Sequence, residues 1–257
     1  MKKTLALLGR WAALLILLLG VLLAGPVWML ASDQIVTEAH WSALDRSSAN
    51  IAPSPEDVSE AVVQVYAARA YNWRGAFGVH AWIATKAQDA DYYRLHQVLS
   101  WRRPTVVSSI DMPDRFWFGN SPELLADYRG EQAQAMIPRI DDAVARFPYV
   151  DLYRVWPGPN SNSFIAWVAR EVPGFDVSLP ITAIGKDYLF DNVFAPVPSG
   201  TGYQFSLGGV VGVLVAREEG VEVNVLGLGV GVDIMRPAIK LPGIGRLGMP
   251  AGVMGNH

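Results

Sequence analysis

The segment around Ser161 combines features from which a nucleophilic site could be built. Residues 156–164 read WPGPNSNSF, which predicts the end of a strand, a tight turn and the start of a helix. Unpaired N–H groups and the positive dipole at a helix N-terminus lower the free energy of an alkoxide or a tetrahedral oxyanion. Ser161 is therefore a candidate nucleophile, and Asn160, Asn162 and Ser163 are candidate oxyanion or binding groups.

A serine hydroxyl also needs a general base, because it is a weak nucleophile alone. His80 lies inside an expected strand, next to Trp82 on the same face, where an imidazole could be held rigidly and Trp82 could contribute to binding. His96 is expected on the paired strand and could orient His80. His40 and His257 lie in a linker and at the last position, so they are poor candidates. This set would hydrolyse or transfer an acyl group at an amide or ester bond.

Each of these residues also has a structural interpretation. Ser161, Ser163 and Asn160 are typical of any helix N-cap. His80 could be a hydrogen-bonded structural histidine, and His96 shares a face with Arg94, which indicates solvent. The residues leave two hypotheses open: an enzyme, or a non-catalytic protein that uses the same scaffold to bind a partner, a lipid or a cell-wall component.

Several other classes of function do not fit the sequence. The chain has no cysteine, which excludes disulfides, thiolate metal sites and a cysteine nucleophile. Its net charge is −3 without a run of Lys or Arg, so a nucleic-acid footprint is absent. The aspartates have no metal-ligand spacing with histidine, and the glycine-rich segments 198–202 and 227–231 match neither a phosphate loop nor a dinucleotide fingerprint. We therefore expect neither a metal nor a cofactor.

The N-terminus predicts a membrane anchor. Residues 11–31 carry no charge, and a helix of this length spans about 30 Å, the thickness of a hydrocarbon core. Lys2, Lys3 and Arg10 precede the run and Asp33 is the first charge after it, which predicts a cytoplasmic N-terminus. A cleaved signal peptide is the alternative, but its apolar core would be shorter and would end in a small-x-small site.

The remaining pattern predicts one exported α+β domain with an antiparallel sheet and helices packed on it. We expect an anchor over residues 1–31, a tether over 32–56 that ends at Pro53-Ser54-Pro55, and the domain over 57–257. Expected strands cover residues 61–70, 77–85, 92–101 and 149–156, followed by two long strands at 203–217 and 221–234. Expected helices begin at Ser121, run through 132–147, and cover 164–172.

Four segments together resemble a bacterial family of unknown function with a membrane-proximal N-terminus. They are residues 156–164, 183–188 (AIGKDY), 198–202 (PSGTG) and 240–243 (KLPG). The resemblance covers most of residues 60–250. It implies a single-pass protein of the bacterial inner membrane, with the domain on the periplasmic side.

The order of the candidate residues also resembles circularly permuted papain-like hydrolases, the NlpC-type peptidases and lecithin retinol acyltransferase-like enzymes. Asn160 to Phe164 is similar to their Asn-Cys-x-x-Phe segment, with Ser161 in the cysteine's place. The resemblance implies that His80 is the base and His96 the third polar residue. A hydroxyl in place of a thiolate removes the pre-ionised nucleophile of that chemistry. Either the serine receives stronger help from the base, or the scaffold is not catalytic.

Overall fold

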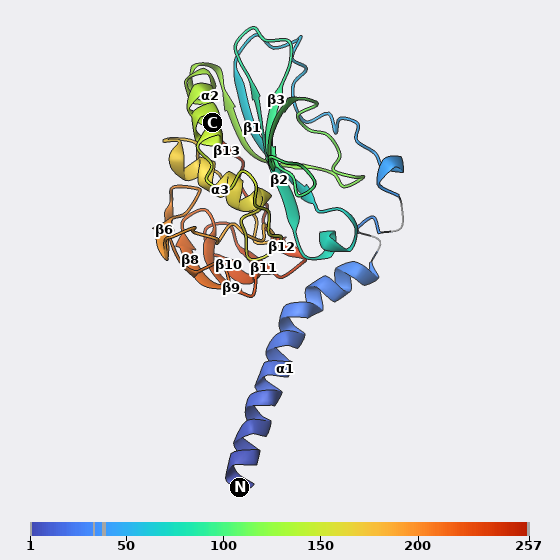
Figure 1. Ribbon diagram of the computed structural model, residues 1–257, viewed down its shortest axis with the longest axis vertical. Coiled ribbons are helices and arrows are strands. Elements are labelled where there is room, and N and C mark those ends of the chain that lie inside the picture. The colour runs from blue at the N-terminus through green and yellow to red at the C-terminus, as the bar shows by residue number, and fades with distance from the viewer. Residues whose placement is uncertain (1, 33, 38–39, 256–257) are drawn as a thin grey trace.

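A computed structural model describes residues 2–32, 34–37 and 40–255, so Asp33 and His257 lie outside the described residues. The chain forms an α+β structure of two sheets with helices packed on the first, and one long apolar helix extends from it (Figure 1). This agrees with the fold class that the sequence predicts.

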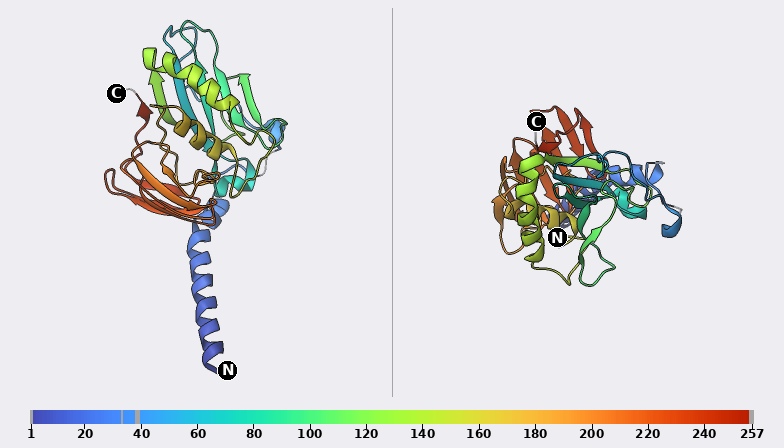
Figure 2. Two further views of the ribbon diagram at one scale, coloured as in Figure 1. Left: turned by 60° about the vertical axis from the view of Figure 1, so that its left-hand side comes forward. Right: turned by 90° about the horizontal axis from the view of Figure 1, so that it is seen from above.

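The helix α1, Lys2–Ala31, projects from the rest of the molecule (Figures 1 and 2). Within it, Leu7–Ala31 is long and apolar enough to cross a membrane. Its C-terminal end meets the domain in a small apolar cluster of Met29, Ile35 and Ala76, against which Phe77 and Ile244 pack. The C-terminal end of α1 is therefore held on the domain by side-chain packing.

The first sheet has the strand order β13-β5-β1-β2-β3-β4. All its pairs are antiparallel except β13 with β5. Two α-helices, α2 and α3, pack on one face, and the short 3-10 helices η1 and η2 precede and follow β1. The bounds are β1 Val62–Arg69, β2 Val79–Lys86, β3 Arg94–Val98, β4 Val106–Ile110, β5 Glu123–Arg129, β13 Met254–Gly255, α2 Gly130–Ala145, α3 Ser161–Glu171, η1 Trp41–Ala43 and η2 Asn72–Ala76.

Both faces of β1 and β2 are buried, which explains their nearly continuous apolar sequences. Val63, Val65 and Ile83 point toward α2 and α3 in the larger core cluster. Tyr66 and Trp82 point to the opposite face, into a second, aromatic cluster. The expected strands at 61–70, 77–85 and 92–101 are confirmed as β1, β2 and β3, and the expected helices at 132–147 and 164–172 as α2 and α3.

The second sheet, β12-β11-β10-β9-β8-β7-β6, is antiparallel throughout. It lies at the end of the domain from which α1 extends (Figure 2). Its strands are β6 Phe194–Pro196, β7 Gly202–Leu207, β8 Val211–Ala216, β9 Gly220–Val225, β10 Leu228–Asp233, β11 Ala238–Leu241 and β12 Gly245–Gly248.

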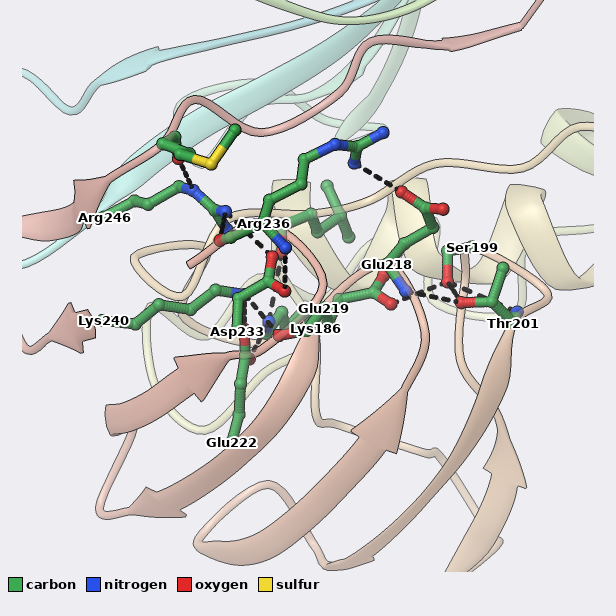
Figure 3. A network of polar contacts seen from close by, with 12 residues as sticks. Lys186, Ser199, Thr201, Glu218, Glu219, Glu222, Asp233, Arg236, Lys240 and Arg246 are labelled. Carbon is green, nitrogen blue, oxygen red and sulfur yellow. Dashed lines mark hydrogen bonds and ion pairs between the residues drawn. The ribbon is translucent and has the colours of Figure 1, made fainter. Parts of the chain in front are cut away.

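The inner face of this second sheet carries a buried polar network (Figure 3). Glu222 accepts hydrogen bonds from the ammonium groups of both Lys186 and Lys240, and all three side chains are buried. Burial by itself would raise the pKa of Glu222, but the two ammonium groups outweigh it and lower this pKa. Lys186 is thus bound to β9 by a long-range contact and, through Glu222, is linked to Lys240 of β11.

Three sequence predictions are wrong. Ser121-Pro122-Glu123 does not start a helix but leads into β5, because β1 needs a partner on its free edge and tertiary pairing overrides a local cap signal. Residues 149–156 form turns rather than a strand. Each of the two long expected strands is divided into two shorter strands. Gly208-Gly209 and Leu226-Gly227 have positive φ values and form the tight hairpin turns that divide them.

The second half of the expected tether, residues 32–56, lies on the domain. The carboxylate of Asp114 accepts hydrogen bonds from the Ser48 hydroxyl and from the N–H groups of Ile51 and Ala52. Tyr93 donates to the carbonyl of Pro53. The segment after α1 is therefore bound to the first sheet and can contribute side chains to a site there.

Replacement of Glu222 by Gln should destabilise the protein strongly. The substitution removes the carboxylate that both buried ammonium groups share, and breaking a buried pair costs about 3–5 kcal/mol. Chemical unfolding of the full chain in detergent measures the loss. The control is Glu171→Gln, which breaks a surface pair with Arg146 and should change the unfolding midpoint little. Equal effects of the two variants would contradict the role of Glu222.

Candidate functional site

A cavity of about 960 Å³ is lined by both Ser161 and His80. Its wall comes from the start of β2, from β3, from η2 and from loops on either side of α3. The β9–β10 turn closes it from the second sheet, through Leu226 and Leu228. Segments far apart in the chain therefore meet here.

Asn160 caps α3 and holds the loops around its start. Its side-chain oxygen accepts hydrogen bonds from the N–H groups of Asn162 (2.9 Å) and Ser163 (3.1 Å). Its amide nitrogen donates to the carbonyls of Val155 and Ile184. All polar atoms of this side chain are used, so its observed role is structural. The two N–H groups that were expected to stabilise an oxyanion are engaged by the cap.

Asn162 ties the start of α3 to the start of β2. Its amide nitrogen donates to the carbonyl of Val79 (3.0 Å), the residue before His80, and to the carbonyl of Ile184 (2.9 Å). Its side-chain oxygen is buried and has no hydrogen-bond partner among the described residues. The hydrogen bond between Asn162 and Val79 therefore joins the residue that follows Ser161 to the residue that precedes His80.

Ser161 itself is 3 % exposed and bonded to Tyr153. Burial raises the pKa of Tyr153, whereas hydrogen bonds from the Ser161 side chain and backbone lower it in part. The neighbour of Ser161 is therefore a neutral phenol, which cannot act as a base near neutral pH.

His80 is held among aromatic rings. Its Nε2 lies 3.1 Å from the side-chain oxygen of Gln97, and its ring stacks on Trp117 at a centroid distance of 3.8 Å. Burial lowers the pKa of His80 to about 3, with a hydrogen bond to Gln97 acting against it and Arg115 adding to it. The imidazole is therefore neutral at physiological pH and is a weak base.

Ser161 and His80 approach the cavity from different sides. His80 shares the face of β2 that carries Trp82, whereas α3 packs on the opposite face. The cavity reaches both because Phe77, Gly78 and Val79, at the start of β2, also line it. Among the described residues, no direct hydrogen bond joins the two side chains.

The other predicted site residues lie away from the cavity. His96 points to the helix face of the sheet, where it contacts Ser108, Thr85 and Asp141, and Gln97 takes the position next to His80. His96 is also not solvated, being 1 % exposed, and burial lowers its pKa to about 4. The Trp82 ring stacks on the His80 ring, and its indole N–H donates to the carbonyl of Pro113. Ser163 is buried within the cap of α3.

Aromatic rings and arginines that the sequence analysis did not single out make up a large part of the cavity wall. Five of the nine tryptophans line it, together with four arginines and one carboxylate, that of Asp111. Arg115 is paired with Asp111. Among the described residues, no carboxylate lies within ion-pair distance of the other three, Arg46, Arg74 and Arg102.

The guanidinium groups of Arg46, Arg74 and Arg115 lie over aromatic rings. Arg46 is 4.6 Å from the ring centroid of Phe118, and Arg74 is 5.0 Å from that of Trp73. The neighbouring Trp-Arg pairs at 73–74 and 101–102 were the sequence signal for this wall. Within the part of the chain that the structure describes, no group of three or more His, Asp or Glu side chains could hold a metal ion.

Residues 60–188 match a family model described as "Protein of unknown function (DUF3750)". The match spans half of the chain and includes β1 to β5, α2, α3 and the loop through Tyr188. The second sheet lies beyond it. No match was found among curated proteins or among solved structures.

Replacement of Gly185 by Ala should disrupt the cap of α3. A Cβ here would lie 2.3 Å from the amide nitrogen of Asn160, and the backbone has φ = +97°. The matched control is Gly208→Ala, which also has a positive φ but no atom within 4 Å of the added Cβ. The control should cost about 1 kcal/mol of strain. Gly185→Ala should cost clearly more in the same unfolding measurement, and equal costs would contradict the packing argument.

Proposed function

We propose, for a chain that belongs to the family described as "Protein of unknown function (DUF3750)", that it is a membrane-anchored protein that binds an anionic amphiphile in this cavity. The observation that carries the proposal is the combination of aromatic rings with three arginines that have no carboxylate partner among the described residues. Such a wall fits a ligand with an apolar body and a carboxylate or phosphate end.

The position of the cavity supports a ligand drawn from a membrane. The rim residues Trp73 and Arg74 belong to η2, and Ala76 of η2 packs on Met29 of α1. If α1 spans a bilayer, the rim lies close to the lipid surface. The basic residues before the helix support an extracytoplasmic position for the domain, in the bacterial envelope.

Three features favour binding over catalysis. The first three N–H groups of α3 are bonded to Asn160 and Tyr153, so an oxyanion would have to displace them. His80 has a pKa of about 3, far below that of an efficient general base at neutral pH. Ser161 lies beside a phenol, and among the described residues no hydrogen bond joins it to an imidazole.

A second candidate function is acyl hydrolysis or transfer with a papain-like arrangement. The specific observation in its favour is that Ser161, His80 and Gln97 all line one cavity. His80 uses Nε2 for Gln97 and leaves Nδ1 for another partner. On this hypothesis Gln97 orients the base, and a substrate that displaces Tyr153 would allow Ser161 to face His80.

Loss of two arginines should weaken amphiphile binding. We expect the double variant Arg46→Gln/Arg74→Gln to bind oleate about tenfold more weakly or worse, since each guanidinium contributes a charge-assisted hydrogen bond or ion pair. The measurement is native mass spectrometry of the full chain, released from a neutral detergent with added oleate.

The matched control is Arg139→Gln/Arg217→Gln, two exposed arginines that do not line the cavity. This control should bind oleate as the unmodified chain does, and oleyl alcohol should bind weakly to every variant. Equal loss in both double variants, or binding of the alcohol as tight as that of oleate, would contradict the proposal.

Ser161→Cys tests the two candidate functions against each other, because the chain has no other thiol. We expect the rate of alkylation by iodoacetamide to rise with an ordinary thiol pKa of about 8.5 or higher, as for a buried thiol without a base. A midpoint below about 7 that moves upward on addition of His80→Gln would instead establish a papain-like pair. Ser109→Cys, in the same cavity, is the control for access.

A further inference from the structure

The second sheet is apolar on its outer face and polar on its inner face. Along β7 to β11, the side chains that point inward include Gln204, Glu222, Asn224, Asp233 and Lys240, all buried. The outward positions in the strands β6 to β12 carry only apolar side chains or glycine. An ordinary two-layer protein has the opposite arrangement.

The outward side chains form continuous rows because the strand register aligns them. One row crosses six neighbouring strands through the pairs Tyr203–Val215, Val215–Val221, Val221–Val232, Val232–Ile239 and Ile239–Leu247. These six side chains are between 37 and 60 % exposed. A second row runs beside it through Phe205, Val213 and Val223. Exposed apolar surface of this extent marks an interaction face.

The end of α1 lies against this same sheet. A Cβ on Gly25 would be 1.9 Å from the carbonyl oxygen of Pro242, and one on Gly243 would be 2.7 Å from the backbone nitrogen of Pro26. Residues 242–244 form the turn between β11 and β12. The apolar helix therefore packs against the turn that joins β11 and β12, two strands that contribute outward side chains to the apolar face.

The length of α1 sets the depth of that contact. About 20 helical residues cross a hydrocarbon core, so a crossing that begins at Leu7 reaches the far boundary near Pro26. The turn at 242–244 touches the helix at this level. Figures 1 and 2 show the second sheet at the end of the domain from which α1 extends, with the first sheet farther away.

We propose that the outward face of β6 to β12 lies on the lipid surface from which α1 emerges. This inference rests on the anchoring part of the proposed function but not on the ligand of the cavity. A bilayer is the occupant because α1 brings it to the edge of the face. Burial of the rows in the interface removes apolar surface from water, and the rim of the cavity then opens beside the same lipids.

The test uses variants of the full chain that each carry a single cysteine. No native cysteine has to be replaced first, because the chain contains no cysteine. Val213→Cys and Val232→Cys report on the outward face, Leu17→Cys on α1, and Gln132→Cys on the exposed side of α2. Each variant carries an environment-sensitive nitrobenzoxadiazole fluorophore and is reconstituted in phosphatidylcholine nanodiscs. Quenching is measured with nitroxide-labelled lipid and, separately, with aqueous iodide.

We expect fluorescence loss from the lipid-borne quencher and little from iodide at positions 213, 232 and 17, and the reverse at position 132. Iodide quenching at 213 and 232 with lipid quenching at 17 would overturn this inference and leave the anchor intact. Iodide quenching at 17 as well would overturn the anchor. Protection at 213 from both quenchers, with energy transfer between two labelled chains in one disc, would assign the face to a second copy and overturn the lipid proposal.

Discussion

The carbonyl oxygen of Ile184 is the point on which the arrangement of the domain depends. It accepts hydrogen bonds from the side chains of both Asn160 and Asn162, which also hold Val155 and Val79. These contacts fix the start of α3 and of β2 and the loop at 184 in one place. Since buried amides lose free energy without partners, the loops around the cavity cannot move independently.

The loop that begins at this point carries Lys186 into the second sheet. There Lys186 and Lys240 share the carboxylate of Glu222, and the inner face of the sheet is built from ionic and polar groups (Figure 3). The charged side chains of this buried network pair with one another and occupy the inner face of the sheet, which leaves little space there for an apolar core. The apolar residues of the sheet consequently face outward, and one structural choice accounts for both the polar interior and the apolar surface beside α1.

The cavity contains the candidate catalytic residues but does not give them the chemical properties that catalysis needs. Ser161, His80 and Gln97 all line it, yet Ser161 and His80 approach it from different sides and the imidazole is too weakly basic. The low basicity of His80 follows from its surroundings, since the aromatic wall that suits the cavity to an amphiphile also desolvates the imidazole. Aromatic packing that favours binding of an apolar ligand therefore opposes general base catalysis.

Local patterns in the sequence determined the apolar helix, β1 to β3 and the cap of α3, because helix length, β-branched runs and Asn-Ser caps act within a few residues. They did not predict β5, since pairing with β1 overrides the Ser121-Pro122 start signal. They also assigned to His96 the role that Gln97 has, because a strand's inward face depends on register. They predicted strands over residues 203–217 and 221–234 without assigning a buried face to either. Only the position of Lys186, Glu222 and Lys240 in the tertiary structure decided that the polar face is the buried one.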